Sequence, residues 1–361
     1  IFALGVQPYI NSSIIIQLLT IAIPPLERLA REGGEEGKKK IQSITRYTTV
    51  GIAILQAVGY YFMMRNYNLL ASDATGIWPA LVIVVSFIAG SSFVMWMGEQ
   101  ITEFGIGNGI SMILFAGILS RGGSAVLKMW QYFQMGAQST KYYFYVPLVL
   151  ILFLAMIVFI VVMTSAERRI PVQYAKRVVG RKLYGGQSTF MPIKVNMSGV
   201  LPIIFAQSIA TLPATIVAFT GTGSSSFWTW MNTYIFDTKS AFYIVCYFLL
   251  IIAFSYFYAT IQFNPIEIAN NLKKNGGFIP GFRPGKPTSD FILKVINKIT
   301  LFGALYLAIV AILPIIVGIV IKNSSLAIGG TSVIIVVGVA LETVKSLEAQ
   351  MLMRHYKGFL E

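Results

Sequence analysis

Nine long stretches of this 361-residue chain carry no charged residue and consist mainly of apolar side chains. They are residues 1–26, 47–64, 74–98, 104–120, 142–164, 199–220, 240–263, 299–321 and 323–341. A helix that crosses a bilayer needs about 20 such residues. The stretches do not alternate apolar and polar residues with a period of two, as the strands of a membrane barrel do. The pattern therefore predicts an all-α polytopic membrane protein.

The first stretch is unusually polar for a membrane helix, although it has no charge. On a helical wheel Val6, Ile10, Ser13 and Gln17 fall within about 60° of one another, so this face changes from apolar to polar along the helix. Pro8, Pro202 and Pro213 are expected to interrupt their stretches, which is tolerated where the backbone lines a cavity. These features predict an aqueous or partly aqueous interior.

Composition supports the membrane assignment, and the distribution of charge predicts a topology. The chain is 56% hydrophobic and 12% charged, whereas soluble domains average about 25% charged residues. Its net charge is +14, and 22 of the 28 Lys and Arg residues lie in alternate connections, at 27–46, 166–199, 262–300 and 345–361. Basic loops face the cytoplasm. The C-terminus is therefore predicted to be cytoplasmic.

Two of these basic connections, 166–199 and 262–300, are long enough to form ordered surfaces. The segment "RRIPVQYAKRVV" alternates in the manner of a β-ribbon, and "IPGFRPGKP" predicts a turn with Arg283 at its tip. We expect both loops to bind a partner. The alternative is that they only set the topology and contact anionic lipids.

Several kinds of chemistry have no support in the sequence. With one cysteine and one histidine, no Cys/His metal site can form, and we expect no catalytic residue, no metal and no cofactor. The string "GIGNGIS" (105–111) predicts a glycine turn that leads into a short helix.

A secondary transporter of a small solute also uses broken helices, but the apolar stretches lack the carboxylates that ion-driven carriers usually keep. That transporter, and an insertase without a through-pore, remain as alternatives.

Six segments resemble, in the same order, the SecY family of channel-forming subunits of bacterial Sec protein translocases, of a low-GC Gram-positive type. They are "FALGVQPYINSSIIIQLLT" (2–20), "MGEQITEFGIGNGIS" (97–111), "ERRIPVQYAKR" (167–177), "PIKVNMSGVLPIIFAQSI" (192–209), "ANNLKKNGGFIPGFRPG" (269–285) and "GGTS" (329–332). The resemblance implies two pseudo-symmetric helical halves around an hourglass pore. The chain would begin within helix 2 and lack helix 1 and the plug.

The resemblance also implies a division of the chain and a set of functional residues. The N-terminal half would be 1–120 (helices 2b to 5), an external hinge region 121–146, and the C-terminal half 147–361 (helices 6 to 10), including both basic loops. The implied apolar pore ring consists of Val6, Ile10, Ile110, Leu114, Ile204 and Ile335. The implied lateral gate contains Asn11, Ser12, Gln17, Gln56, Gln207, Ser208 and Leu212. The residues implied in docking SecA or the ribosome are Arg168, Arg169, Lys176, Arg177, Arg181 and Arg283.

The function implied by the resemblance is passive conduction of unfolded secretory polypeptides across the bacterial cytoplasmic membrane. Transmembrane segments would leave laterally into lipid through a gate between helices 2b/3 and 7/8. SecA or the ribosome would supply the driving force. The implied partners also include SecE, a SecG-type subunit, the signal peptide, the nascent chain, and ribosomal RNA at the basic loops.

Overall fold

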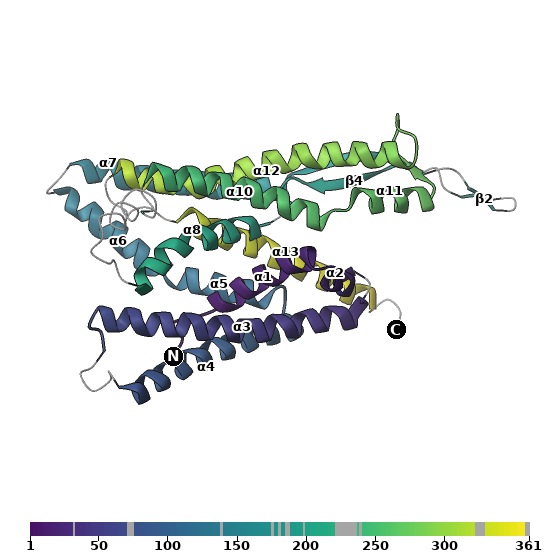
Figure 1. The fold of residues 1–361 in the computed structure, drawn as a ribbon. Helices are drawn as coiled ribbons and strands as arrows, with labels where there is room; N and C mark the ends of the chain where they lie inside the picture. Colours follow the sequence, from purple (N-terminus) through teal and green to yellow (C-terminus); the bar gives the residue numbers. More distant parts are fainter. Residues whose placement is uncertain are drawn as a thin grey trace. The chain divides into compact units, whose positions relative to one another are not determined.

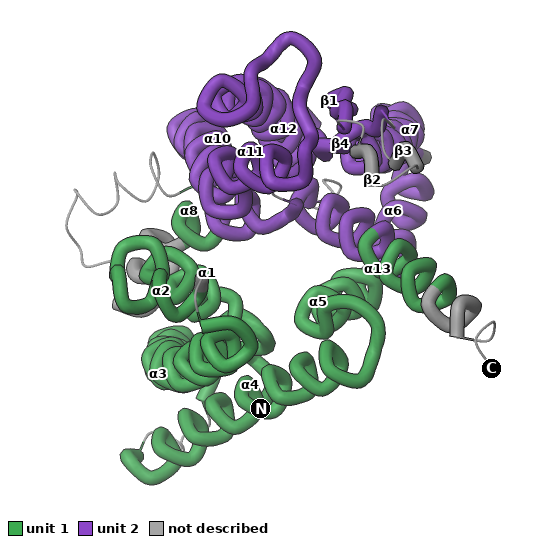
Figure 2. The backbone as a smooth tube through the Cα atoms, turned by 90° about the vertical axis from the view of Figure 1, so that its right-hand side faces the viewer, with its two compact units in different colours: residues 1–121, 208–240, 342–361 green, residues 122–207, 241–341 purple. Residues whose placement is uncertain are grey.

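The computed structural model describes residues 1–361 apart from 32, 71–75, 138–139, 175–176, 180–181, 185–187, 198, 221–236, 238–239, 322–328 and 358–361. The described chain forms two compact units, coloured separately in Figure 2. Unit 1 comprises 1–121, 208–240 and 342–361, and unit 2 comprises 122–207 and 241–341. The predicted division into halves that follow chain order stays a prediction.

Each charge-free stretch coincides largely with one of nine helices in the described chain, which confirms the all-α membrane architecture (Figure 1). The helices are α1 (Gln7–Ala22), α3 (Gly34–Asn66), α4 (Ile77–Phe104), α5 (Gly109–Ser120), α7 (Lys141–Ser165), α8 (Leu201–Thr220), α10 (Ala241–Gln262), α12 (Lys286–Val320) and α13 (Gly330–Lys357). Among the described residues, seven helices are long and apolar enough to cross a membrane, or eight if the bent pair α1 and α2 (Pro24–Arg31) is one span.

Unit 1 is built on a series of packed helices in which α1 contacts α3, α3 contacts α4, and α4 contacts α5. The approach of α4 and α5 depends on glycine, because a side chain at Gly109 would collide with the carbonyl oxygen of Gly98. The chain bends by 106° between α1 and α2. The bend falls at Ile23, before Pro24 and Pro25, where the residue preceding a proline avoids the helical region.

The prolines do not act as the sequence pattern predicted. Pro8 lies in the first turn of α1, and Pro202 is the second residue of α8. The first turn of a helix tolerates proline because its backbone N–H groups have no partner within the helix. The helix α8 also continues past Pro213 to Thr220. The expected interruptions at these three positions were therefore wrong.

Unit 2 combines α7, α10 and α12 with a small antiparallel sheet. The sheet has the strand order β4 (Ser188–Lys194), β1 (Glu167–Tyr174), β5 (Gly277–Phe278), and β2 (Arg177–Val179) pairs with β3 (Lys182–Tyr184) in a separate hairpin. The sheet core packs on the N-terminal part of α12, and α11 (Pro265–Lys274) lies at the same end (Figure 1). The predicted β-ribbon in the first basic loop is confirmed.

Residues 121–146, expected as an external hinge region, are largely helical. They contain α6 (Gly122–Gln134), the short 3₁₀ helix η2 (Met135–Ala137) and the first turn of α7. By itself α5 has 12 residues, or about 18 Å of helix, which is less than the thickness of the hydrocarbon core. Residues Gly109–Gln134 together reach the length of a span.

Candidate functional site

The polar face of α1 lies partly inside unit 1. The hydroxyl of Ser12 is buried and donates to the carbonyl oxygen of Thr45 on α3 over 2.8 Å. Gln17 Nε2 donates to Ser13 Oγ one turn earlier, at 3.3 Å. Of the predicted gate residues, Ser12 therefore holds α1 against α3, while Gln17 bonds within α1.

Two other predicted gate residues carry buried oxygen atoms without partners. Asn11 on α1 and Gln56 on α3 are half-buried, and neither Asn11 Oδ1 nor Gln56 Oε1 has a hydrogen-bond partner among the described residues. Leaving a buried polar atom unpaired costs about 1–3 kcal/mol. Such atoms are uncommon in native structures and call for a physical explanation.

The apolar candidates in unit 1 form two pairs, each spaced by four residues. Val6 is the N-cap of α1 and Ile10 lies in its first turn, while Ile110 and Leu114 lie on α5, so each pair lies along one helix face. Val6 is buried, and the other three are half-buried. The end of the Ile110 side chain lies against Gly98 of α4, so this residue also fills the space between two helices.

The glycine turn before α5 has the geometry that the sequence predicts. Gly107 has φ +75°, a backbone conformation that side chains disfavour. Asn108 caps the helix, because its side-chain oxygen accepts from the backbone N–H of Ser111 at 3.2 Å. The N–H of Gly109 donates to Thr102 Oγ1 at 2.9 Å. These bonds fix the direction in which α5 leaves α4, and with it the positions of Ile110 and Leu114.

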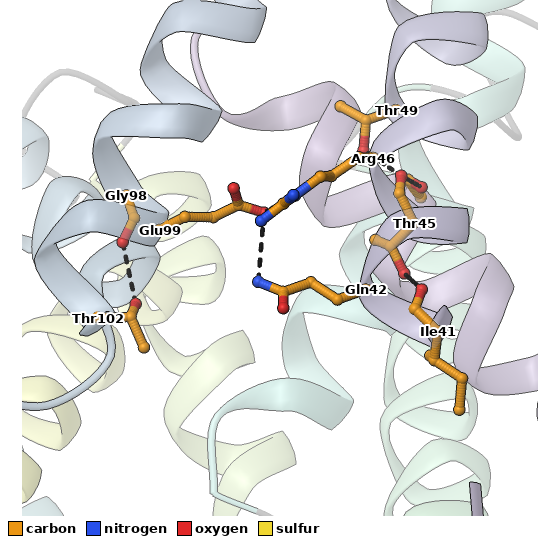
Figure 3. A network of polar contacts seen from close by, with 9 residues as sticks. Ile41, Gln42, Thr45, Arg46, Thr49, Gly98, Glu99 and Thr102 are labelled. Carbon is orange, nitrogen blue, oxygen red and sulfur yellow. Dashed lines mark hydrogen bonds and ion pairs between the residues drawn. The ribbon is translucent and has the colours of Figure 1, made fainter. Parts of the chain in front are cut away.

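A polar cluster between α3 and α4 was missed by sequence reasoning. Arg46 Nε donates to Glu99 Oε1 over 2.7 Å, and Gln42 Nε2 donates to the same oxygen at 3.4 Å (Figure 3). The Glu99 side chain is only 10% exposed, against 47% for Arg46. One sequence signal could have found the pair: opposite charges directly border the stretches 47–64 and 74–98 at ends that meet in an antiparallel hairpin.

In unit 2, the start of α8 turns one face to the core. Ile203, Phe205 and Ala206 are buried, and the ring of Phe205 meets the rings of Phe254 and Tyr258 edge-on, at centroid distances of 5.9 and 6.3 Å. The predicted ring residue Ile204 lies between these buried neighbours and is half-buried. Ile335 on α13 is likewise half-buried and follows the buried Val333 and Ile334.

The remaining gate candidates follow directly in α8. Gln207 is exposed and Ser208 is half-buried. The carbonyl oxygen of Ser208 accepts from Thr211 Oγ1 at 3.2 Å. Leu212 belongs to α8, but its side chain lies outside the described residues.

The two basic loops, separated by more than 60 residues, meet in one sheet. Strand β1 comes from the first loop and β5 from the second, and they pair through Gln173 with Phe278 and Tyr174 with Gly277. On β1, Ile170 and Val172 are buried against Ile292 and Ile296 of α12. We call this assembly of β4, β1, β5 and the N-terminal part of α12 the docking sheet, after the partner-binding role expected of its loops from the sequence.

Charged candidates lie on the exposed parts of the docking sheet. Arg168 and Arg169 are exposed and face Ile193 and Pro192 of β4 in the strand register. Arg283 is exposed in the turn after β5. Lys176 and Arg181 lie outside the described residues, as does the side chain of Arg177, whose backbone belongs to β2.

The turn that carries Arg283 is fixed by local contacts. It lies between Gly281 (φ +88°) and Gly285 (φ +107°). The Arg283 carbonyl oxygen accepts from Thr288 Oγ1 of α12 over 2.8 Å, and the rings of Phe282 and Phe291 are 4.2 Å apart. The predicted turn is confirmed, and it holds the Arg283 backbone against the start of α12.

Comparison with known proteins gives matches along most or all of the chain. The family model described as SecY matches residues 1–344. "Protein translocase subunit SecY" of Streptomyces scabiei is 44% identical over 375 residues, covering 100% of this chain and 83% of that protein. The protein of the same name from Mycobacterium tuberculosis is 44% identical over 380 residues, with the same two coverages.

Solved structures show the same fold at low sequence identity. A protein-conducting channel superposes with a TM-score of 0.66 at 17% identity, covering 96% of this chain and 81% of that one. Sec61 in a canine ribosome–channel complex gives 0.62 at 15% identity, covering 96% and 81%. The expectation that this chain resembles SecY proteins of low-GC Gram-positive bacteria in particular stays a prediction.

Proposed function

The chain belongs to the SecY family, and from this premise we propose that it is the channel-forming subunit of a bacterial protein translocase. It is a multi-pass membrane protein with seven candidate spans among its described residues. The observation that carries the proposal is 44% identity, over the whole chain, with proteins described as translocase subunits. The channel would conduct unfolded secretory polypeptides across the cytoplasmic membrane and perform no covalent chemistry.

The pore ring would consist of Val6, Ile10, Ile110, Leu114, Ile204 and Ile335. Five of these side chains are half-buried, so they retain apolar surface that the fold does not cover. A ring of apolar side chains can close to ions by dewetting and needs no specific chemical group. It also tolerates the varied side chains of a passing polypeptide, because it makes no directional bonds.

The lateral gate would use the uncharged polar residues of α1, α3 and α8. The unpaired oxygens of Asn11 and Gln56 support this role, since a gate residue can exchange partners as the gate moves. Hydrogen bonds between membrane helices contribute about 0.6–2 kcal/mol each. A small number of such bonds would keep the gate closed and still allow an apolar signal peptide to displace them.

The docking sheet would bind SecA or the ribosome on the cytoplasmic side. Its exposed arginines support this proposal, together with the positive-inside distribution of charge. Arg283 would support SecA, because the anchored turn presents it at low conformational cost. Contacts of Arg168 and Arg169 with ribosomal RNA phosphates would weaken as the salt concentration rises.

We place the C-terminus in the cytoplasm and expect SecE and a SecG-type subunit as partners.

Transport by reconstituted vesicles tests the proposal. The full-length protein is incorporated with SecE into vesicles, and SecA, ATP and a secretory precursor are added outside. The precursor should become protected from external protease, and protection should require ATP. Uptake of a small solute without precursor protection would instead identify a secondary transporter and overturn the proposal.

A further inference from the structure

A small cavity lies inside unit 2, between the segment that follows β4 and two membrane helices. Its lining comes from Val195, Asn196 and Met197, from Ser255 on α10, and from one face of two turns of α12, at Thr300, Gly303, Ala304 and Leu307. The cavity has a volume of about 10 Å³. One water molecule requires roughly 10–15 Å³ measured in this way.

One polar side chain in this lining lacks a bonding partner. Thr300 is 4% exposed, and its hydroxyl oxygen is buried with no hydrogen-bond partner among the described residues. Several helical threonines elsewhere in the chain, among them Thr45, Thr49 and Thr260, donate to the carbonyl oxygen one turn earlier. Thr300 departs from that pattern at the point where α12 borders the cavity.

Other polar groups surround the same space. Asn196 is 8% exposed and Ser255 is 2% exposed, and both line the cavity. The carbonyl oxygen of Val195 faces α12 so closely that a side chain at Gly303 would come within 2.7 Å of it. The cavity is therefore lined by polar groups from three parts of unit 2, and such polar cavities hold water whereas apolar ones stay dry.

We propose that this cavity is a binding site for one water molecule that bridges Thr300 to the segment Val195–Met197. The Thr300 hydroxyl would donate to the water, which in turn donates to oxygen atoms of the opposite wall. A buried water normally makes about three hydrogen bonds, and the groups in the lining are sufficient for that number. The inference depends only on the packing of unit 2 and not on the proposed function.

The site matters because of what Val195–Met197 connects. The segment joins β4, an edge strand of the docking sheet, to α8, which begins at Leu201. The bound water would hold this connection against α10 and α12. Loss of the water should increase the mobility of the segment between the docking sheet and α8, without changing the sheet itself.

Hydrogen exchange tests this expectation in the full-length protein with its partner subunits in lipid nanodiscs. Thr300→Val keeps the shape of the side chain and removes the hydroxyl. The backbone amides of residues 195–201 should then exchange about three- to tenfold faster, as expected for loss of one or two hydrogen bonds. Thr300→Ser should exchange like the unsubstituted protein, because it retains the hydroxyl.

A matched control and a direct observation keep the result interpretable. Thr49→Val removes an equally buried hydroxyl that bonds within its own helix, and it should leave residues 195–201 unchanged. Equal exchange in Thr300→Val and the unsubstituted protein would overturn the proposal. A high-resolution density map offers a second test: a peak within bonding distance of Thr300 Oγ1 supports the site, whereas a Thr300 hydroxyl bonded directly to the Ile296 carbonyl refutes it.

Discussion

Glu99 and Arg46 illustrate what a single residue can and cannot reveal from sequence. Both border charge-free stretches, so their place near the membrane surface follows from the pattern. Their direct contact depends also on the rotation of α3 and α4 about their axes, which the bordering charges alone do not determine. The same limit applies to Ile110, whose identity predicts an apolar contact but not that it packs against Gly98.

Replacing Glu99 by Gln should lower stability modestly. The substitution removes the charge that receives hydrogen bonds from Arg46 and Gln42, and we expect a loss of about 1 kcal/mol because Arg46 is half exposed to solvent. Thermal unfolding of the purified protein measures the change. Glu35→Gln is the control, since its pair with Lys38 is highly exposed and should contribute almost nothing. Equal midpoints for the two variants would contradict the argument.

Replacing Ile204 by Gly should raise ion permeability if this residue belongs to the pore ring. Removal of the side chain widens the proposed constriction and allows water, and then ions, to enter. Conductance across a planar bilayer detects the leak, which should be severalfold greater than that of the unsubstituted channel. Ile204→Leu retains apolar volume and should remain tight. Unchanged conductance in the glycine variant would remove Ile204 from the ring.

At the scale of elements, the helices were predictable and their connections only partly so. A run of about 20 uncharged apolar residues has few alternatives to a membrane helix, and alternation in "RRIPVQYAKRVV" sufficed to predict β1. The partner β5 has only two residues, which is too short to give a pattern of its own. The union of the two basic loops was therefore visible only in the structure, where Ile170 and Val172 share one core with α12.

Gly109→Ala should disturb the packing of α4 on α5. The new methyl group would meet the Gly98 carbonyl oxygen, and we expect a loss of about 1–3 kcal/mol as the helices move apart. Gly117→Ala, on the same helix, has open space around its added methyl group and should be neutral or gain up to about 1 kcal/mol in helix propensity. Thermal unfolding measures the stability of both variants. An equal loss of stability in the two would refute the close approach of α5 to α4 at Gly109.

Arg283→Glu should impair export that depends on SecA while leaving the protein assembled. The turn is held by the Arg283 backbone and by neighbouring rings, so reversing the side-chain charge should spare the fold. Initial rates of precursor translocation should fall by at least about tenfold, which corresponds to about 1.4 kcal/mol. Lys286→Glu makes the same change of charge three residues away and should have a smaller effect. Normal export by the Arg283 variant would refute its proposed role.

At the scale of the whole molecule, charge distribution carries the information that apolar stretches lack. The stretches alone fit either orientation in the membrane, whereas the concentration of Lys and Arg in alternate connections selects one. The sequence could not predict that segments 208–240 and 342–361 would group with the first 121 residues. Such grouping depends on contacts between distant segments, which no local pattern records.

Cysteine labelling tests the predicted orientation. In a Cys246→Ser background, which removes the one native thiol, Arg283→Cys and Trp78→Cys place single thiols on exposed sites of opposite predicted sides. A membrane-impermeant maleimide should label position 78 in intact cells and position 283 only in inverted vesicles. The reverse pattern would invert the topology and move the docking sheet away from the cytoplasm.

The docking sheet also has a mechanical consequence. Strand β1 is joined to β4 by seven register pairs but to β5 by only two. If a partner of the proposed kind pulled on the turn at Arg283, the two β1–β5 register pairs should separate well before the seven β1–β4 pairs. The second basic loop would then extend while the β1–β4 pairing of the first loop stays intact. Early separation of β5 from β1 would therefore limit the force that reaches the remainder of unit 2.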